Sequence, residues 1–182
     1  TGNTDVLDFD TNELSSDKVD IVKQGKFEVV SIDGNNVLRA YGNGYPILFA
    51  NTTVTKERPV YYKLKALKYI PSDITNETDN RLFFALVPSK GAGVRVTSAS
   101  SVIKTTSETP VSVSELGSIT AVTARSNGYD SVAADAALYP EIQVQKIVNT
   151  DSVSIYLDDI GMYPYYKATY HLGADNTAAA YF

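Results

Sequence analysis

The sequence predicts an all-β protein, an antiparallel β-sandwich or barrel, and three observations support this prediction. Apolar and polar residues alternate along a series of short segments, which is the period of a half-buried strand. Clusters of Gly, Asn, Asp and Ser separate these segments and are typical of turns. Helical periodicity is almost absent, and residues 132–138 form the single candidate for a helical turn. Many short strands joined by turns are typical of sandwiches and barrels.

The alternating segments give the expected strands in chain order. They are residues 26–32, 36–42, 59–70, 81–87, 93–98, 141–148 and 152–160. Asp33 and Gly34 stand between the first two segments, and an Asp-Gly pair between two strands is a strong hairpin signal. We therefore expect these two strands to pair as a β-hairpin.

The chain length and two segments of unusual composition, residues 97–116 and 165–182, indicate the domain organisation. The chain has 182 residues, which is enough for one domain of ordinary size. Residues 97–116 are rich in Ser, Thr and Val, and they fit either edge strands with loops or a flexible excursion. We expect one β-sandwich domain over residues 1–164. Residues 165–182 are expected to be an appended strand, a linker or the start of a following module.

Composition excludes several classes of function. The net charge of −5 disfavours nucleic acid as a partner, because phosphate binding needs a basic surface. No run of 18 apolar residues exists, so no membrane span is expected. The absence of Cys excludes disulfides, thiol catalysis and thiolate metal sites. Thr1 is not a natural first residue, which indicates a mature form or an excised fragment.

Two adjacent carboxylates, Asp158 and Asp159, interrupt the last strand-like segment. A glycosidase needs two carboxyl groups about 5–10 Å apart that flank the scissile bond. Neighbouring residues of a regular strand point to opposite faces, so this pair is not expected to act as a catalytic dyad. The single His171 lies in the tail, which disfavours a Ser-His-Asp triad. We therefore expect no enzyme activity.

A cation site is the better interpretation of the acidic residues. Ca²⁺ binds six to eight oxygen atoms, and Asp8, Asp10 and Asn12 supply oxygens at alternating positions. This segment is not an EF-hand, because Glu13 stands where that loop needs Gly. Solvated acidic residues in a loop remain the alternative.

Strand alternation also indicates which side chains face solvent. Tyr rings can stack on sugars, while amides and cations can bond to hydroxyl groups. Tyr156 is expected to face outwards, and Tyr45 and Tyr129, each beside a Gly, could overhang the surface. The other outward candidates for carbohydrate binding are Arg39, Tyr41, Tyr61, Lys63, Lys65 and Gln143. An ordinary solvated sheet would show the same pattern. The cations among them favour a polysaccharide that carries uronates, such as pectin.

Five segments together resemble a known family. They are "DFD" (8–10), "NNVLRAYG" (35–42), "PVYYKLKALKY" (59–69), "YPEIQVQ" (139–145) and "SIYLDDIGMYP" (154–164). In this order they resemble the jelly-roll carbohydrate-binding modules that flank polysaccharide-degrading enzymes. The chain departs from that pattern in having Phe9-Asp10 where the family has Phe-Glu, and in having no Trp.

The resemblance implies a fold, a cofactor and a function. The fold is a jelly-roll β-sandwich with a structural Ca²⁺ between the first strand and the penultimate one. Asp10 and Asp158 would be ligands, with Asp159 as a further candidate. Asp8 is a candidate from the oxygen-rich segment and not from the resemblance. The function is non-catalytic binding of plant cell-wall polysaccharide, within a secreted or cell-surface multimodular bacterial protein whose other modules are partners. The alternative is a structural or adhesive spacer domain that binds no sugar.

Overall fold

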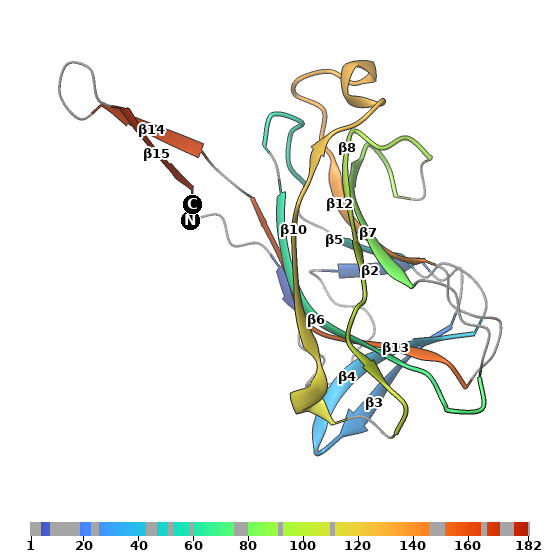
Figure 1. The fold of residues 1–182 in the computed structure, drawn as a ribbon. Coiled ribbons are helices and arrows are strands. Elements are labelled where there is room, and N and C mark those ends of the chain that lie inside the picture. The colour runs from blue at the N-terminus through green and yellow to red at the C-terminus, as the bar shows by residue number, and fades with distance from the viewer. Residues whose placement is uncertain are drawn as a thin grey trace.

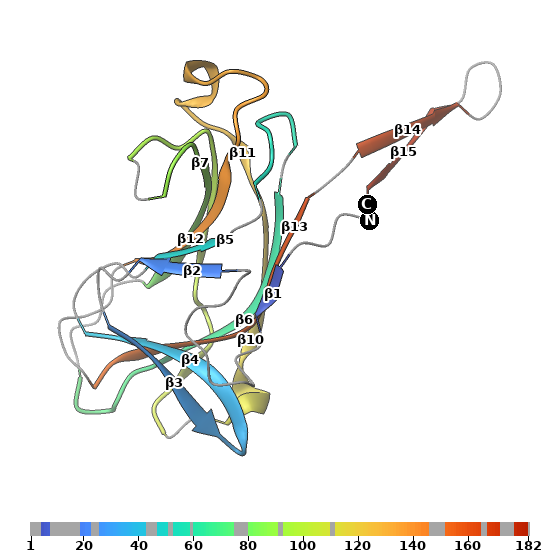
Figure 2. The same ribbon diagram turned by 180° about the vertical axis from the view of Figure 1, so that it is seen from behind.

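The chain folds into two facing, mainly antiparallel sheets in the computed structural model, which confirms the predicted β-sandwich (Figures 1 and 2). The structure describes residues 5–7, 19–22, 26–42, 47–50, 53–58, 60–74, 80–90, 93–109, 112–145, 152–164, 167–171 and 177–181. Within these ranges no α-helix occurs, and two short 3₁₀ turns lie at Val113–Glu115 (η1) and Tyr129–Ser131 (η2). No helix in this part of the chain is long and apolar enough to cross a membrane.

The larger sheet has seven strands, and β13 lies at its centre. Its main order is β10-β6-β13-β4-β3, with β1 pairing with β13 and the short β9 lying parallel to β6. The strands are β1 (Asp5–Leu7), β3 (Lys26–Ile32), β4 (Asn35–Tyr41), β6 (Val60–Tyr69), β9 (Thr106–Ser107), β10 (Gly117–Val122) and β13 (Ser154–Pro164).

The smaller sheet has six strands in the order β11-β8-β7-β12-β5-β2. The strands are β2 (Val19–Val22), β5 (Ile47–Ala50), β7 (Arg81–Val87), β8 (Thr97–Val102), β11 (Ala124–Arg125) and β12 (Tyr139–Gln145). The chain passes from one sheet to the other between β4, β5, β6 and β7, which is the pattern of a jelly roll. The segment 97–116, left open by the sequence, contributes β8 and β9.

Alternating side chains from both sheets form one core. The larger sheet supplies Leu38, Tyr62, Leu64 and Leu157, and the smaller sheet supplies Phe84 among others. The fully buried Tyr62 spans the two layers, because its hydroxyl donates to the carbonyl of Ala85 at 2.8 Å. The residues on either side of these core positions therefore face outwards, away from the other sheet.

The predicted hairpin is confirmed. Strands β3 and β4 pair from Lys26↔Tyr41 to Ile32↔Asn35, and only Asp33 and Gly34 connect them. Their φ angles are +52° and +80°, and a type I′ turn needs positive φ at both positions.

A β-bulge in β13 interrupts the alternation of side chains at Asp158 and Asp159. Asp158 pairs with Lys65 and Gly161 pairs with Lys63, so Asp159 and Ile160 together lie opposite Leu64. Leu157 and Ile160 both belong to the core, which leaves both carboxylates on the outer side of the sheet. The prediction that they point to opposite faces is therefore wrong.

The C-terminal segment forms a two-stranded sheet of its own. β14 (Lys167–His171) pairs with β15 (Thr177–Tyr181), and this hairpin points away from the sandwich (Figure 1). The sequence predicted one strand here, and the structure has two. The boundary after Pro164 stays a prediction.

Candidate functional site

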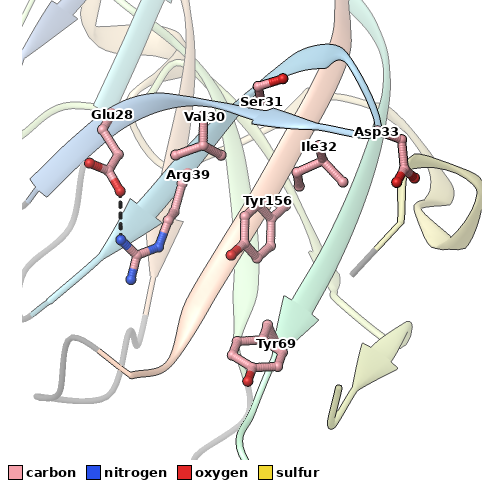
Figure 3. A pocket seen from close by; sticks show the side chains of 8 residues that line it. All are labelled: Glu28, Val30, Ser31, Ile32, Asp33, Arg39, Tyr69 and Tyr156. Atoms are coloured by element: carbon pink, nitrogen blue, oxygen red, sulfur yellow. Dashed lines mark hydrogen bonds and ion pairs between the residues drawn. The ribbon is translucent and has the colours of Figure 1, made fainter. Parts of the chain in front are cut away.

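The outer face of the seven-stranded sheet carries a cavity of about 560 Å³. Figure 3 shows its side chains, which come from β3, β4, β6, β13 and the β3–β4 turn. They are Glu28, Val30, Ser31, Ile32, Asp33, Arg39, Tyr69 and Tyr156. Two phenol rings, one guanidinium group and two apolar side chains thus share one open surface.

Arg39 is held in place by three neighbours. Its Nη1 lies 2.6 Å from Glu28 Oε1, and its Nε donates to Ser154 Oγ at 2.7 Å. Its guanidinium carbon lies 4.2 Å from the centre of the Tyr41 ring. Cation–π stacking and charged hydrogen bonds fix the orientation of this guanidinium group before any ligand arrives.

Strand register brings the two cavity tyrosines close together. On β13, Tyr156 lies opposite Arg39 of β4, and Ser154 lies opposite Tyr69 of β6. Tyr69 and Tyr156 are therefore diagonal neighbours on one face, within reach of one ligand. Burial raises the pKa of Tyr156, and the positive charge of Arg39 opposes that rise. The Tyr156 phenol is thus a neutral hydrogen-bonding group at physiological pH.

The remaining predicted residues of this sheet lie on the same outer face but away from the cavity. Tyr61, Lys63 and Lys65 follow one another at alternate positions of β6. Leu67, at the level of Arg39 and Tyr156, is six residues beyond Tyr61, which corresponds to about 20 Å along a strand. Of the predicted set, Arg39 lines the cavity and Tyr41 supports it.

Gln143 lies on the other sheet, in a second cluster. Its Oε1 accepts hydrogen bonds from Arg95 Nη2 at 3.1 Å and from Gln145 Nε2 at 2.9 Å. Arg95 stacks at 4.3 Å over the ring of Phe83, and both residues line a cavity of about 570 Å³. The predicted carbohydrate-binding residues are thus divided between two opposite faces of the sandwich.

The outer face of the six-stranded sheet is largely closed around β12. Glu141 is only 3% exposed and Gln143 only 8%. An apolar cluster of Ile47, Phe49, Ala85, Val87 and Tyr139 lies on the same side. Burial raises the pKa of the Glu141 carboxyl, and the charge of Arg95 counteracts part of that rise.

Tyr129 does not overhang a binding surface, contrary to the prediction. It is 7% exposed and belongs to the core, with Arg125 and Lys56 on its ring at 4.2 and 4.5 Å. Gly128 beside it serves close backbone packing, because a Cβ atom there would lie 2.6 Å from the Arg95 carbonyl oxygen. Tyr45 lies outside the described residues.

Both carboxylates of the bulge interact electrostatically with Lys65. Asp159 Oδ2 lies 3.0 Å from Lys65 Nζ, and this contact, with a smaller contribution from the charge of Asp158, raises the pKa of Lys65. Asp158 is 7% exposed, close to the level at which β1 pairs with β13 through Leu7↔Ile160. Neither carboxylate lines the two cavities described above.

A metal site at the bulge would need ligands from elsewhere in the chain. In the described ranges, no group of three or more His, Cys, Asp or Glu side chains could hold a metal ion. Asp8 and Asp10 fall outside these ranges, although Asp8 directly follows the last residue of β1. Asp158 is thus a buried carboxylate close to the end of β1.

Sequence reasoning missed Glu28 and Tyr69, and it placed Tyr156 on the outer face without assigning it a role. Alternation within β3 carries a signal for Glu28, because Phe27 faces the core. The proximity of Glu28, Tyr69 and Tyr156 depends on the order β3-β4-β13-β6, which brings together segments far apart in sequence.

No protein-family model and no curated protein matches the sequence, whereas solved structures match the fold. An arabinose-bound MgGH51 α-L-arabinofuranosidase aligns with a TM-score of 0.54 and 12% identity, over 81% of this chain and 23% of that one. The CBM22-2 xylan-binding domain of Paenibacillus barcinonensis Xyn10C aligns with a TM-score of 0.47 and 13% identity, over 88% and 99%. The K3 adhesin domain of Lys-gingipain from Porphyromonas gingivalis gives 0.49 and 10%, over 88% and 99%.

The similarity to the arabinofuranosidase shows a shared fold. Carbohydrate-binding modules of families 11, 22, 27 and 61 are also among the matched structures, with TM-scores between 0.43 and 0.48. The chain spans 23%, 30% and 50% of the first three matched chains, less than two thirds of each.

Burial of Glu141 predicts a pH-dependent gain in stability for the Glu141→Gln variant. Because the folded state raises the pKa of this acid, its ionised form costs stability above that raised pKa. The cost disappears below the ordinary carboxyl pKa of about 4.3. We expect melting curves to show a higher midpoint for the variant at pH 7, by a few degrees, and no difference near pH 4.

Glu108→Gln is the matched control, because it removes an exposed carboxylate. A stabilisation by Glu141→Gln that stays constant or grows on acidification would contradict the assignment.

Proposed function

We propose that this protein is a non-catalytic carbohydrate-binding module and that it binds a polysaccharide in the cavity on the seven-stranded sheet. The observation that carries the proposal is the placement of Tyr69 and Tyr156 beside the fixed guanidinium group of Arg39. Aromatic rings pack against the C–H faces of sugar rings, while planar polar groups bond to the hydroxyls.

The proposed location, partners and parent protein follow from the sequence resemblance. Modules of this kind belong to secreted or cell-surface multimodular bacterial proteins that act on plant cell-wall polysaccharides. Binding would keep a linked catalytic module at high effective concentration on its substrate. The partners would be the polysaccharide and the other modules of the same polypeptide, and no reaction would take place in this domain.

We also propose a structural Ca²⁺ at the bulge of β13. Asp158 would be a ligand from β13, and Asp8 and Asp10 would supply oxygens from the chain beyond β1. Asp159 is the weaker candidate, because it already pairs with Lys65. The ion would compensate the buried carboxylate and hold the N-terminal segment against β13.

The alternative function is a structural or adhesive spacer without sugar binding. The closed outer face around Glu141 and the apolar cluster beside it favour this alternative for the six-stranded sheet. The two tyrosines that line the cavity on the seven-stranded sheet favour a ligand-binding role there.

Affinity gels that contain xylan, mannan, mixed-linkage glucan, galactan or pectin test the binding proposal. We expect at least one polymer to retard the wild-type protein. Tyr156→Ala and Tyr69→Ala should each weaken that retardation at least about tenfold, which corresponds to about 1.4 kcal/mol of binding free energy. The cause is the loss of a stacking ring from the cavity.

Two controls locate the site. Tyr61→Ala removes the same kind of side chain from the same outer face, about 20 Å along β6, and should leave retardation unchanged. Arg95→Ala tests the opposite sheet. If only Arg95→Ala lost binding, the site would lie on the six-stranded sheet. If no polymer retarded the wild-type protein, the binding proposal would be wrong and the spacer alternative would be favoured.

Melting curves with EDTA, and with EDTA plus excess Ca²⁺, test the structural ion. An ion present at a hundredfold its Kd stabilises the folded state by about 2.7 kcal/mol. We expect chelation to lower the midpoint by roughly 5–10 °C, since about 1 kcal/mol corresponds to roughly 2–4 °C in a domain of this size. Asp158→Asn should abolish the response, and an identical midpoint with and without chelator would contradict a tightly held ion.

A further inference from the structure

The charges at the cavity on the seven-stranded sheet are more acidic than basic. Arg39 is the single basic residue among the eight that line it, whereas Glu28 and Asp33 are both acidic. The chain as a whole carries a net charge of −5. A polyanion that approaches this face therefore meets no net attraction.

The one cation of the cavity is already engaged. Glu28 Oε1 accepts from Arg39 Nη1 at 2.6 Å, Ser154 Oγ accepts from Nε at 2.7 Å, and Tyr41 covers one face of the guanidinium group. A ligand carboxylate would have to displace the Glu28 carboxylate or lie beside it. Two carboxylates that share one site repel each other.

The lysines of the same face do not supply the missing charge. Lys65 is paired with Asp159 at 3.0 Å, and the charge of Asp158 also acts on it. Lys63 lies four residues along β6 from Leu67, the residue at the level of Arg39 and Tyr156. That separation is about 13 Å, which exceeds the Debye length of about 10 Å in 0.1 M salt.

We infer that this cavity accepts a neutral sugar backbone and excludes uronate-bearing chains, with Glu28 as the residue that sets this selectivity. This inference rests on the proposed function and names its substrate class. It reverses the uronate preference that the exposed cations indicated in the sequence, because the fold gives Arg39 and Lys65 carboxylate partners. Neutral hydroxyls can still bond to the phenols and to Glu28, which accepts hydrogen bonds.

Polygalacturonate and its methyl-esterified form are the probes, since they share a backbone and differ in charge. In affinity gels at about 0.1 M salt, where the Debye length is about 10 Å, the wild-type protein should bind polygalacturonate no more tightly than the ester. Glu28→Gln frees Arg39 from its carboxylate and should tighten polygalacturonate binding at least about threefold. This gain should vanish near 1 M salt, where the Debye length is about 3 Å.

Two further variants keep the test decisive. Asp135→Asn makes the same change of net charge at an exposed site between η2 and β12, in a segment that does not line the cavity, and it should produce no gain. Asp33→Asn removes the other acid of the cavity from an exposed turn, and it should shift binding in the same direction as Glu28→Gln. Melting curves establish that each variant is folded.

The outcomes separate the two levels of the proposal. A wild-type protein that binds no neutral polymer contradicts the proposed function. Tighter wild-type binding to polygalacturonate than to its ester overturns the selectivity alone. Equal effects of Glu28→Gln and Asp135→Asn overturn the role of Glu28.

Discussion

Strand β13 carries one residue more than β6 between the pairs Asp158–Lys65 and Gly161–Lys63, and the larger sheet depends on how that residue is accommodated. Without a bulge, the residues after Asp159 would face the wrong side, because a slip of one residue exchanges the two faces of a strand. Asp159 takes up the extra residue at a φ of +50°, a region in which Asp is more common than most side chains. Ile160 then returns to the core beside Leu157.

The same bulge places two carboxylates on the outer side of the sheet, where Lys65 and, on our proposal, Ca²⁺ compensate them. It also lets β13 pair with β4 and β6 before it and with β1 after it. Tyr156 and Ser154 belong to the part of β13 that precedes the bulge, and their register with β4 and β6 builds the cavity. Core packing, the acidic pair and the candidate binding surface therefore depend on one strand.

Much of this fold could be predicted from local pattern, but the site could be predicted only in part. Strands β3 and β7 begin and end at the expected residues, because their alternation is regular and strong turn residues bound β3. Strand β5 was missed, because all four of its side chains are buried and show no alternation. The bulge does leave a signal in the sequence. The apolar residues of β13 that face the core stand at odd residue numbers before the bulge (Ile155, Leu157) and at even numbers after it (Ile160, Met162).

The candidate site needed information that no local pattern holds. Alternation placed Arg39 and Tyr41 on an outer face, but the neighbours of Arg39 depend on the order of strands distant in sequence. Glu28, Tyr69 and Tyr156 come together only through β3-β4-β13-β6. The same long-range pairing separated Gln143 from Arg39 and buried Tyr129. The candidate binding surface, which has no Trp, thus depends on the register that aligns two tyrosines beside a fixed arginine.

We propose that a sugar binds over β3, β4, β6 and β13, and NMR on the ¹⁵N-labelled protein tests this most directly. A neutral oligosaccharide of the polymer that binds best would be titrated while amide shifts are followed. We expect the largest shifts at residues 28–41, 67–69 and 154–156. Shifts confined to Phe83, Arg95 and residues 141–145, on the opposite sheet, would contradict the account.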